Sequence, residues 1–318
     1  MSAPARVTIV EVGPRDGLQI EKRFVPTPRK IELVNALTRA GIRRMEVTSF
    51  VSPKVIPQLA DAAEVMAAIE RPADRFHIAL VPNLKGTERA LASGADSVKI
   101  VICTSERYNQ RNVGMSIADS LKNCADVLAA AQRAGKIAEV VIGLSFGCPI
   151  EGPVPEDKVI ALAGRVAAMG YREISIADSM GLANPAQVRS MMRRLLREYP
   201  QAHLSLHLHD TRGLGLANAL VAWEEGIDMF DSSIAGLGGS SVVVSGATGN
   251  VATEDLVNMF HEMGVATGIH MDKLQEAGRL AQEIIGRPLP SRILASGTPA
   301  QFYQRVREEE ERKAALPA

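Results

Sequence analysis

Short apolar stretches alternate with longer amphipathic stretches along almost the whole chain of 318 residues. The apolar stretches are rich in branched aliphatic residues and have the length of β-strands. They predict eight strands: Val7–Val12, Arg44–Phe50, Phe76–Val81, Ser97–Cys103, Glu139–Ser145, Glu173–Ala177, His203–His209 and Met229–Ile234.

Between the strands, apolar residues recur at intervals of three and four, which indicates helices that bury one face. One such series is Ile31, Val34, Leu37 and Ala40. Four of the predicted helices are followed by glycine just before the next strand, as expected where the chain leaves a helix in the left-handed conformation. These glycines are Gly41, Gly94, Gly170 and Gly226.

Strands that alternate with helices imply parallel pairing through right-handed crossovers, and eight such units are enough to close a barrel. We therefore predict an α/β fold, a (β/α)8 TIM barrel, with residues 1–286 as the catalytic domain. A last helix over Met271–Ile285 and the Pro-marked stretch near Pro288 and Pro290 are expected to pack on the barrel. Residues 287–318 are expected to form a C-terminal extension and tail, with a frayed helical tail from Glu308 on. An open, doubly wound sheet is the alternative, weakened because no Gly-x-Gly-x-x-Gly motif follows the first strand.

Composition narrows the class of protein further. Hydrophobic residues make up 46% of the chain and charged residues 23%, which is ordinary for a globular protein. Basic and acidic residues both number 36, so no net charge attracts nucleic acid or an acidic membrane. The three cysteines are far apart and odd in number, and no signal peptide or membrane-length apolar run is recognisable, so a cytoplasmic protein is expected.

The first predicted strand ends in Glu11-Val-Gly-Pro-Arg-Asp-Gly-Leu-Gln19, where Gly and Pro break the strand. In a TIM barrel, functional groups come from the carboxyl ends of the strands and the loops that follow. Arg15 and Asp16 are therefore expected at the rim, where a carboxylate can bind a metal and a guanidinium can stabilise an oxyanion. The alternative is a surface Arg-Asp pair in a turn.

The seventh strand reads His203-Leu-Ser-Leu-His-Leu-His-Asp210, with leucine at every second position. Because successive side chains point to opposite faces, outward leucines place His207 and His209 together in the barrel mouth. Two imidazoles one rung apart can share a cation, and Asp16 completes a three-ligand set with positions open for substrate and water. We predict a divalent metal site, with zinc, manganese and magnesium all open.

Two more carboxylates occupy apolar settings. Glu46 lies between Met45 and Val47 in the second strand, and Asp178 follows the sixth. A buried charge without a partner costs several kcal/mol, so each is expected to have a cationic or hydrogen-bonding partner, with Arg15 the natural candidate. Both are candidate catalytic groups, and a structural ion pair beneath the site is the alternative.

A Gly-rich loop runs from Gly236 to Asn250 after the eighth strand. It is too long for an ordinary connection to the next helix, and it predicts a mobile lid, with a plain flexible loop as the alternative. Asn250 precedes the helix that Thr253 is expected to cap, so its amide is a candidate fourth metal ligand.

Six segments together resemble the 3-hydroxy-3-methylglutaryl-CoA lyase family, a branch of the barrel metallolyases. The resemblance extends roughly from Val7 to Gly286. The segments are Glu11 to Gln19, Thr48-Ser-Phe-Val-Ser-Pro-Lys54, Pro82-Asn-Leu-Lys-Gly86, Gly147-Cys-Pro149, His207-x-His-Asp-Thr211 and Gly236-Leu-Gly-Gly239.

This resemblance implies a magnesium or manganese ion on Asp16, His207, His209 and Asn250. It also implies retro-Claisen cleavage of a 3-hydroxy-3-methylacyl-CoA to acetyl-CoA and a keto acid, as in leucine degradation. Arg15 would then steady the enolate oxygen. Coordination of the substrate hydroxyl to the metal makes that hydroxyl easier to deprotonate.

One position departs from the family pattern. The family has a cysteine directly after Gly-Leu-Gly-Gly, thought to act in proton transfer, whereas this chain has Ser240. A serine hydroxyl is a far weaker acid than a thiol of pKa about 8.5, so Ser240 is a poor replacement, and Cys148 is not assumed to take over.

Three hypotheses follow. The first is a lyase for hydroxymethylglutaryl-CoA with altered proton transfer, and the second a lyase for a related ester such as citramalyl-CoA, which would release pyruvate. The third is a catalytically silent metal-binding protein, against which the retained Arg15, Asp16 and histidine pair argue. Lys22 is a candidate contact for the phosphates of CoA, with solvated surface charge as the alternative, and the resemblance implies a homodimer.

Overall fold

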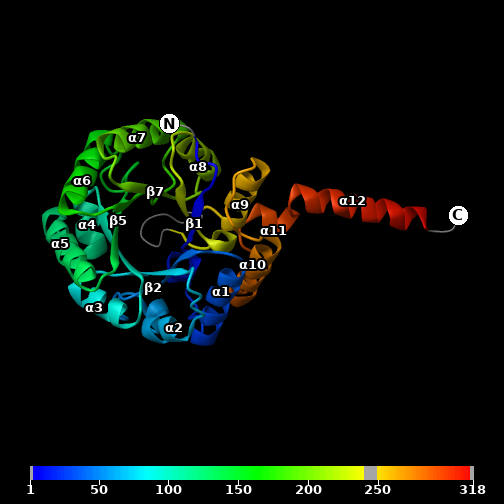
Figure 1. Ribbon diagram of the computed structural model, residues 1–318, viewed down its shortest axis with the longest axis horizontal. Coiled ribbons are helices and arrows are strands. Elements are labelled where there is room, and N and C mark those ends of the chain that lie inside the picture. Colours follow the sequence, from blue (N-terminus) through cyan, green and yellow to red (C-terminus); the bar gives the residue numbers. More distant parts are fainter. Residues whose placement is uncertain (1–2, 240–248, 316–318) are drawn as a thin grey trace.

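The structure is a computed structural model that describes residues 3–239 and 249–315. Eight parallel strands pair in chain order, and the eighth pairs back to the first, so the sheet closes into a barrel. Figure 1 shows the strands inside a ring of helices. The predicted (β/α)8 barrel is therefore confirmed.

The strands are β1 (Thr8–Glu11), β2 (Arg44–Ser49), β3 (Phe76–Leu80), β4 (Ser97–Cys103), β5 (Ile137–Gly143), β6 (Glu173–Asp178), β7 (His203–Leu208) and β8 (Met229–Ser232). The outer helices are α1 (Thr27–Arg39), α2 (Ala62–Ala68), α3 (Leu84–Ala92), α4 (Glu106–Val113), α5 (Ile117–Arg133), α6 (Glu156–Met169), α7 (Pro185–Glu198), α8 (Gly215–Glu224) and α9 (Thr253–Glu262). Three short helical turns are η1 (Gly13–Gly17), η2 (Pro57–Leu59) and η3 (Ile234–Gly236).

The predicted strands agree with the observed ones to within about two residues at most ends. The first strand stops before Val12, because the Val12 carbonyl accepts hydrogen bonds from the amides of the next turn, η1. The four glycines predicted to end helices all have left-handed φ angles, between 81° and 110°. At these positions a side chain would be strained, so glycine lets each helix turn directly into the next strand.

The main core lies between the barrel and its helices. Leu204, Leu206 and Leu208 of β7 belong to it and are at most 2% exposed, so the alternation predicted for this strand is confirmed. A smaller apolar cluster, Val10, Val12, Ile78 and Met229, fills part of the barrel. Outward leucines leave the intervening side chains of β7 for the interior, which positions its histidines.

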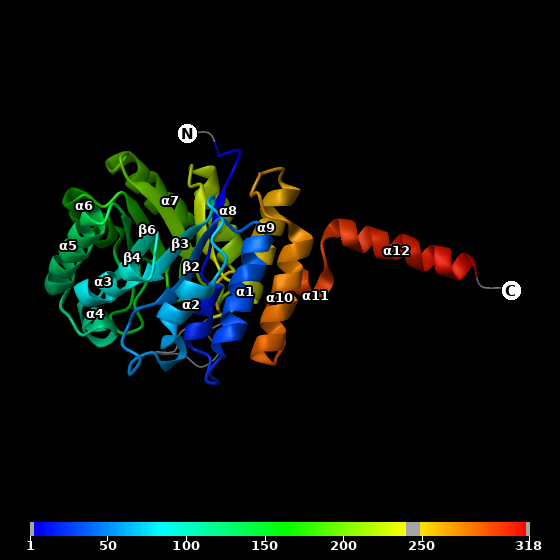
Figure 2. The same ribbon diagram turned by 60° about the horizontal axis from the view of Figure 1, so that its bottom comes forward.

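The chain continues through α10 (Met271–Ile285), α11 (Arg292–Ser296) and α12 (Pro299–Ala314). Helix α10 lies beside α1 (Figure 2), and α11 is held by Asp255, which accepts hydrogen bonds from Ser291, Arg292 and Ile293. The expected packing of the extension is therefore right for α11. Helix α12, which includes the helical tail predicted from Glu308 on, has no buried residue and projects away from the barrel. The division at residue 286 stays a prediction.

Within the described residues, no helix combines the length and apolarity that a membrane span requires.

Candidate metal centre and active site

The turn after β1 positions the first two functional side chains. The Val12 carbonyl accepts hydrogen bonds from the amides of Arg15, Asp16 and Gly17, which winds the chain into the π-helical turn η1. The Arg15 Nη1 atom lies 2.5 Å from Asp16 Oδ1. Both side chains line the cavity at the barrel mouth, as predicted, and neither is a free surface charge.

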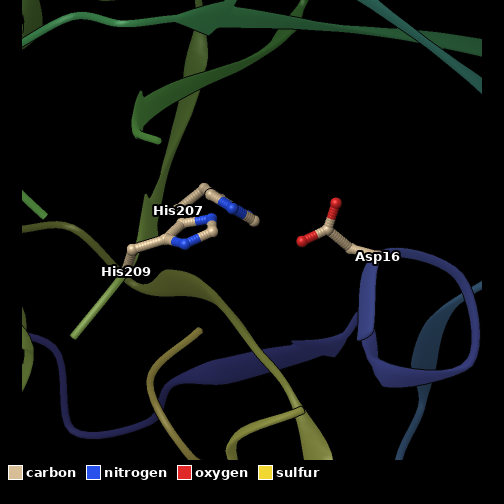
Figure 3. Close-up of side chains that lie close together, drawn as sticks. All are labelled: Asp16, His207 and His209. Atoms are coloured by element: carbon tan, nitrogen blue, oxygen red, sulfur yellow. The ribbon is translucent and has the colours of Figure 1, made fainter. Parts of the chain in front are cut away.

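The two histidines of the β7 end meet Asp16 across this cavity. Their ring centroids are 5.2 Å apart. One ligand atom from each of Asp16, His207 and His209 lies within 4.8 Å of the others, an arrangement that could hold a metal ion (Figure 3). The structure thus brings together the three residues that the sequence predicted as ligands.

Asn250 adds an amide to the same group. Its backbone bridges to His209, and its Nδ2 atom donates hydrogen bonds to Asp16 Oδ2 at 2.8 Å and to the Leu237 carbonyl at 3.2 Å. Its Oδ1 atom is buried and has no hydrogen-bond partner among the described residues. A buried amide oxygen without a partner is costly, and a cation beside Asp16 would satisfy it.

The electrostatics of the cavity keep Asp16 ionised. Burial alone would raise the pKa of its carboxyl, but Arg15 and the two histidines outweigh burial and lower that pKa to about 2. An ionised carboxylate is the form that binds a cation. The protein therefore presents a charged oxygen ligand throughout the physiological pH range.

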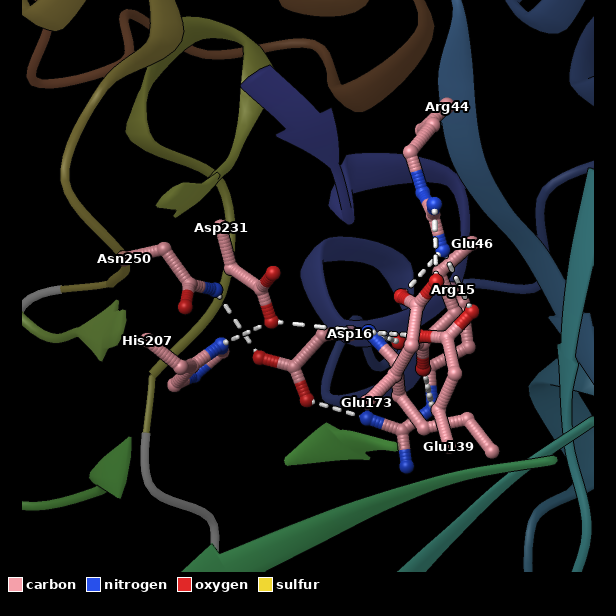
Figure 4. A network of polar contacts seen from close by, with 10 residues as sticks. Arg15, Asp16, Arg44, Glu46, Glu139, Glu173, His207, Asp231 and Asn250 are labelled. Carbon is pink, nitrogen blue, oxygen red and sulfur yellow. Dashed lines mark hydrogen bonds and ion pairs between the residues drawn. The ribbon is translucent and has the colours of Figure 1, made fainter. Parts of the chain in front are cut away.

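A second carboxylate, Asp231 on β8, orients one of the histidines and was missed at the sequence level. Its Oδ2 atom lies 3.1 Å from His207 Nδ1, so the other ring nitrogen is left for a metal. Asp231 in turn lies 3.6 Å from Lys99 Nζ on β4 (Figure 4 shows Asp231 with its neighbours). The available signal was a single charged residue at an inward position of an apolar strand, in Met229-Phe-Asp-Ser232 and Ser97-Val-Lys-Ile-Val-Ile-Cys103.

The partner predicted for Glu46 is present. Glu46 Oε1 lies 3.1 Å from Arg15 Nε, and the Glu46 side chain is only 4% exposed. Asp178 has the expected hydrogen-bonding partners, but Arg15 is not among them: its carboxylate accepts hydrogen bonds from the backbone amides of Leu182 and Ala183, at 2.8 and 2.9 Å. The chain turns back sharply after β6 at Gly181, with φ of 59°, so backbone donors reach Asp178.

A buried carboxylate beneath the rim braces the loops that carry the site. Glu11 Oε1 accepts hydrogen bonds from the amides of Gly13 and Ile234, at 2.7 and 2.8 Å, and Glu11 Oε2 accepts one from the Thr253 hydroxyl at 2.6 Å. A Cβ atom at Gly13 would lie 2.6 Å from Glu11 Oε1, so any other residue there would displace this carboxylate. Glu11 therefore ties η1 to the segments on both sides of the Gly-rich loop.

The opposite wall of the cavity is apolar. It consists of Leu80, Val101, Cys103, Tyr108, Val141 and Met180. Burial raises the pKa of the Cys103 thiol to about 12, so this sulfur is a neutral group at physiological pH. The cavity therefore has a charged side that suits oxygen atoms and an apolar side that suits carbon.

Comparison with known proteins identifies the family of this chain. The family model described as HMGL-like matches residues 6–281. The chain belongs to this family. The mitochondrial hydroxymethylglutaryl-CoA lyase of Rattus norvegicus is 44% identical over 290 residues, which cover 91% of this chain and 89% of the rat protein. Hydroxymethylglutaryl-CoA lyase YngG of Bacillus subtilis is 42% identical, with 92% and 98% covered.

Solved structures of HMGL-like relatives share the whole architecture. The crystal structure of the Bacillus subtilis HMG-CoA lyase has a TM-score of 0.90 at 42% identity, and covers 93% of this chain and 99% of its own. An HMG-CoA lyase from Acinetobacter baumannii, solved with coenzyme A and 3-methylmalate, has a TM-score of 0.89 at 40% identity, with 94% and 98% covered. The family resemblance drawn from the sequence is confirmed.

One predicted site residue of this HMGL-like protein, Lys22, lies apart from the cluster. Lys22 is exposed and borders a surface groove beside Phe24 and Ile56, and Gln19 and Ile20 line both this groove and the central cavity. Ser240 and the following loop, the predicted lid, lie outside the described residues, although Gly239 just before them lines the cavity.

Proposed function

We propose that this protein is a carbon–carbon lyase that depends on a divalent metal and cleaves a 3-hydroxy-3-methylacyl-CoA of the hydroxymethylglutaryl-CoA type to acetyl-CoA and a keto acid. The observation that carries the proposal is the convergence of Asp16, His207 and His209 with Arg15 in one cavity. Relatives 42–44% identical over nine-tenths of the chain are hydroxymethylglutaryl-CoA lyases, which supports the same reaction.

The metal ligands in this proposal are Asp16, His207, His209 and Asn250. Two nitrogen and two oxygen donors, with positions left for substrate, suit a divalent cation, and the buried Oδ1 atom of Asn250 supports the fourth ligand. The family resemblance makes magnesium or manganese the proposed metal. When bound, the cation supplies Lewis-acid polarisation of the substrate's 3-hydroxyl group.

The protein's own residues then guide the bond cleavage. The 3-hydroxyl proton is lost, the bond between C2 and C3 breaks, and its electron pair moves into the thioester as an enolate, which takes up one proton at carbon to give acetyl-CoA. Arg15 lies beside Asp16 and Glu46, so its guanidinium is fixed where it can bind the enolate oxygen. Asp178 holds the loop after β6, and Ser240 is the proposed, weak counterpart of a proton-donating group.

The CoA portion of the substrate is proposed to leave the cavity past Gln19 and Ile20 and to place its phosphates near Lys22. Gln19 and Ile20 border both the cavity and the adjoining groove, and Lys22 borders the groove, which supports this path. A homodimer, a cytoplasmic location and a role in leucine degradation are part of the same proposal.

The test is an assay of product identity. The purified protein is incubated with Mn²⁺ or Mg²⁺ and either hydroxymethylglutaryl-CoA or citramalyl-CoA, and acetoacetate and pyruvate are measured together with acetyl-CoA. The proposal predicts metal-dependent acetoacetate release from the first ester. Pyruvate release from the second ester alone would reassign the substrate, and no turnover of any acyl-CoA would leave a silent metal-binding protein.

A further inference from the structure

A single lysine lies at the floor of the active-site cavity, inside the barrel. Lys99 of β4 is 2% exposed and lines the cavity. Its Nζ atom is 3.2 Å from Glu46 Oε2, 3.6 Å from Asp231 Oδ2 and 3.6 Å from Glu139 Oε2. Three strands besides its own, β2, β5 and β8, thus direct a carboxylate at one ammonium group.

Two of these carboxylates each contact a group that the proposed reaction uses. Glu46 lies 3.1 Å from Arg15, and Asp231 lies 3.1 Å from His207. Figure 4 shows these residues within one network of polar contacts. The ammonium group of Lys99 is therefore the point where the contacts behind Arg15 and the contacts behind His207 meet.

We propose that Lys99 is a positioning residue: its ammonium group joins the carboxylate that orients Arg15 to the carboxylate that orients His207, so the enolate-binding group and the metal ligand are held in one geometry. This inference rests on the proposed function for the roles of Arg15 and His207. Lys99 itself does not touch the reacting atoms.

The physical reason is charge balance in a buried cluster of ionisable groups. Glu46, Asp231 and Glu139 are all buried, and like charges at such separations repel strongly in a low-dielectric interior. Burial alone would lower the pKa of Lys99, yet attraction to the three carboxylates outweighs burial and raises it, so the group stays an ammonium. The ammonium group has three donor hydrogens, so it can interact with three carboxylates at once.

Without this cation, each carboxylate has only its other partner to balance it. Glu46 would then be paired with Arg15 alone, and Asp231 with His207 alone. The guanidinium and the imidazole would therefore change orientation. Glu139 differs from these two carboxylates. Arg44 lies 2.9 Å from it, and its ion pairs among the described residues are with Arg44 and Lys99, not with Arg15 or His207. Glu139 therefore offers a matched control within the same ion cluster.

The experiment compares Lys99→Met with Glu139→Gln. Mn²⁺ affinity is measured by calorimetric titration without substrate, and kcat and KM are measured with the ester that the wild type cleaves. Groups that orient metal ligands typically affect metal affinity or activity by about 10–100-fold. We expect Lys99→Met to weaken Mn²⁺ binding and lower kcat by about this factor with KM within about threefold, and Glu139→Gln to keep all three values within about threefold.

A structural role alone would lower the melting temperature of Lys99→Met and leave Mn²⁺ affinity and kcat unchanged, which would overturn the proposal. If Lys99→Met does not fold, the double variant Lys99→Met/Glu139→Gln also removes one of the three buried negative charges that faced the lysine, and the same loss of Mn²⁺ affinity is expected. Wild-type affinity in that variant would equally overturn it. Because the titration needs no substrate, it is independent of which acyl-CoA is cleaved, whereas a wild type that binds no Mn²⁺ contradicts the proposed function.

Discussion

Glu11, which is buried, and Asp16, which is partly buried, are carboxylates on one short segment, yet their surroundings shift their pKa values in opposite directions. For both, burial is the largest influence and favours the protonated form. At Asp16 the charges of Arg15 and the histidines outweigh it, and the pKa falls to about 2. At Glu11 only uncharged donors, the Thr253 hydroxyl and two backbone amides, oppose burial, and the pKa rises to about 7.

The comparison shows what distinguishes a carboxylate that can bind a metal from one that holds loops together. A buried carboxylate stays charged where cations surround it, and hydrogen bonds from neutral groups are not enough. Asp16 is thus prepared to bind a metal, whereas Glu11 holds loops together in a form that exchanges a proton near neutral pH. Replacing each carboxylate by its amide should separate these two roles.

The largest effect is expected for Asp16→Asn. An amide lacks the negative charge that the proposed cation needs, and loss of about 4 kcal/mol of stabilisation corresponds to a decrease of about 10³-fold in kcat/KM. Metal content is measured by elemental analysis and activity by acetyl-CoA release. Glu11→Gln is the matched control, and it should retain its metal. Equal metal content in both variants would contradict the distinction.

Arg15→Lys tests the role of Arg15, one of the cations that lower the pKa of Asp16. Lysine keeps the charge but cannot contact Asp16 and Glu46 with separate nitrogens while binding an oxyanion. We expect kcat to fall by about 10²-fold, with Mn²⁺ affinity changed much less, because the metal ligands remain. Steady-state kinetics and a Mn²⁺ titration check this. A rate within about threefold of the wild type would show that Arg15 only balances charge.

The pKa of Glu11 predicts a pH dependence of stability. Because its folded pKa is raised from 4.5 to about 7, the folded state binds more protons than the unfolded state between these values. The free energy of unfolding should therefore decrease as pH rises from about 4.5 to 7, with Glu11 contributing up to about 3 kcal/mol. Urea unfolding at several pH values measures it.

The control for this prediction is Glu11→Gln, which should flatten that part of the curve. Glu254 is also buried, and its pKa is raised well above the ordinary value, so it contributes a decrease of the same sign. The informative quantity is therefore the difference between the wild-type and Glu11→Gln curves. Parallel curves would mean that Glu11 does not titrate in this range.

The smallest effect is expected for Asp178→Asn. One carboxylate oxygen that accepts a backbone amide would be replaced by an NH₂ group, so one of two hydrogen bonds is lost, at a cost of about 1–2 kcal/mol in stability. Chemical denaturation measures this loss, and metal affinity should be unchanged. If the turnover rate instead fell by about 10²-fold while stability stayed the same, Asp178 would be a direct participant in catalysis.

Local sequence determined much of this protein. The alternation of leucine with polar residues in β7 was sufficient to place His207 and His209 on one face, because the side-chain period of a strand is two. The repeated order of strand, helix and glycine was sufficient to predict eight units, because left-handed glycines end helices next to strands. Both signals are carried by residues close together in the chain.

Only the tertiary structure decided which charges meet inside the barrel. Lys99, Glu46 and Asp231 come from β4, β2 and β8, and their contacts depend on barrel closure and on the register of each strand. The partner of Asp178 depended on a turn that brings backbone amides back to it, which no side-chain pattern records. Sequence period fixes the face to which a side chain points, whereas its partner across the barrel is set by packing of the whole fold.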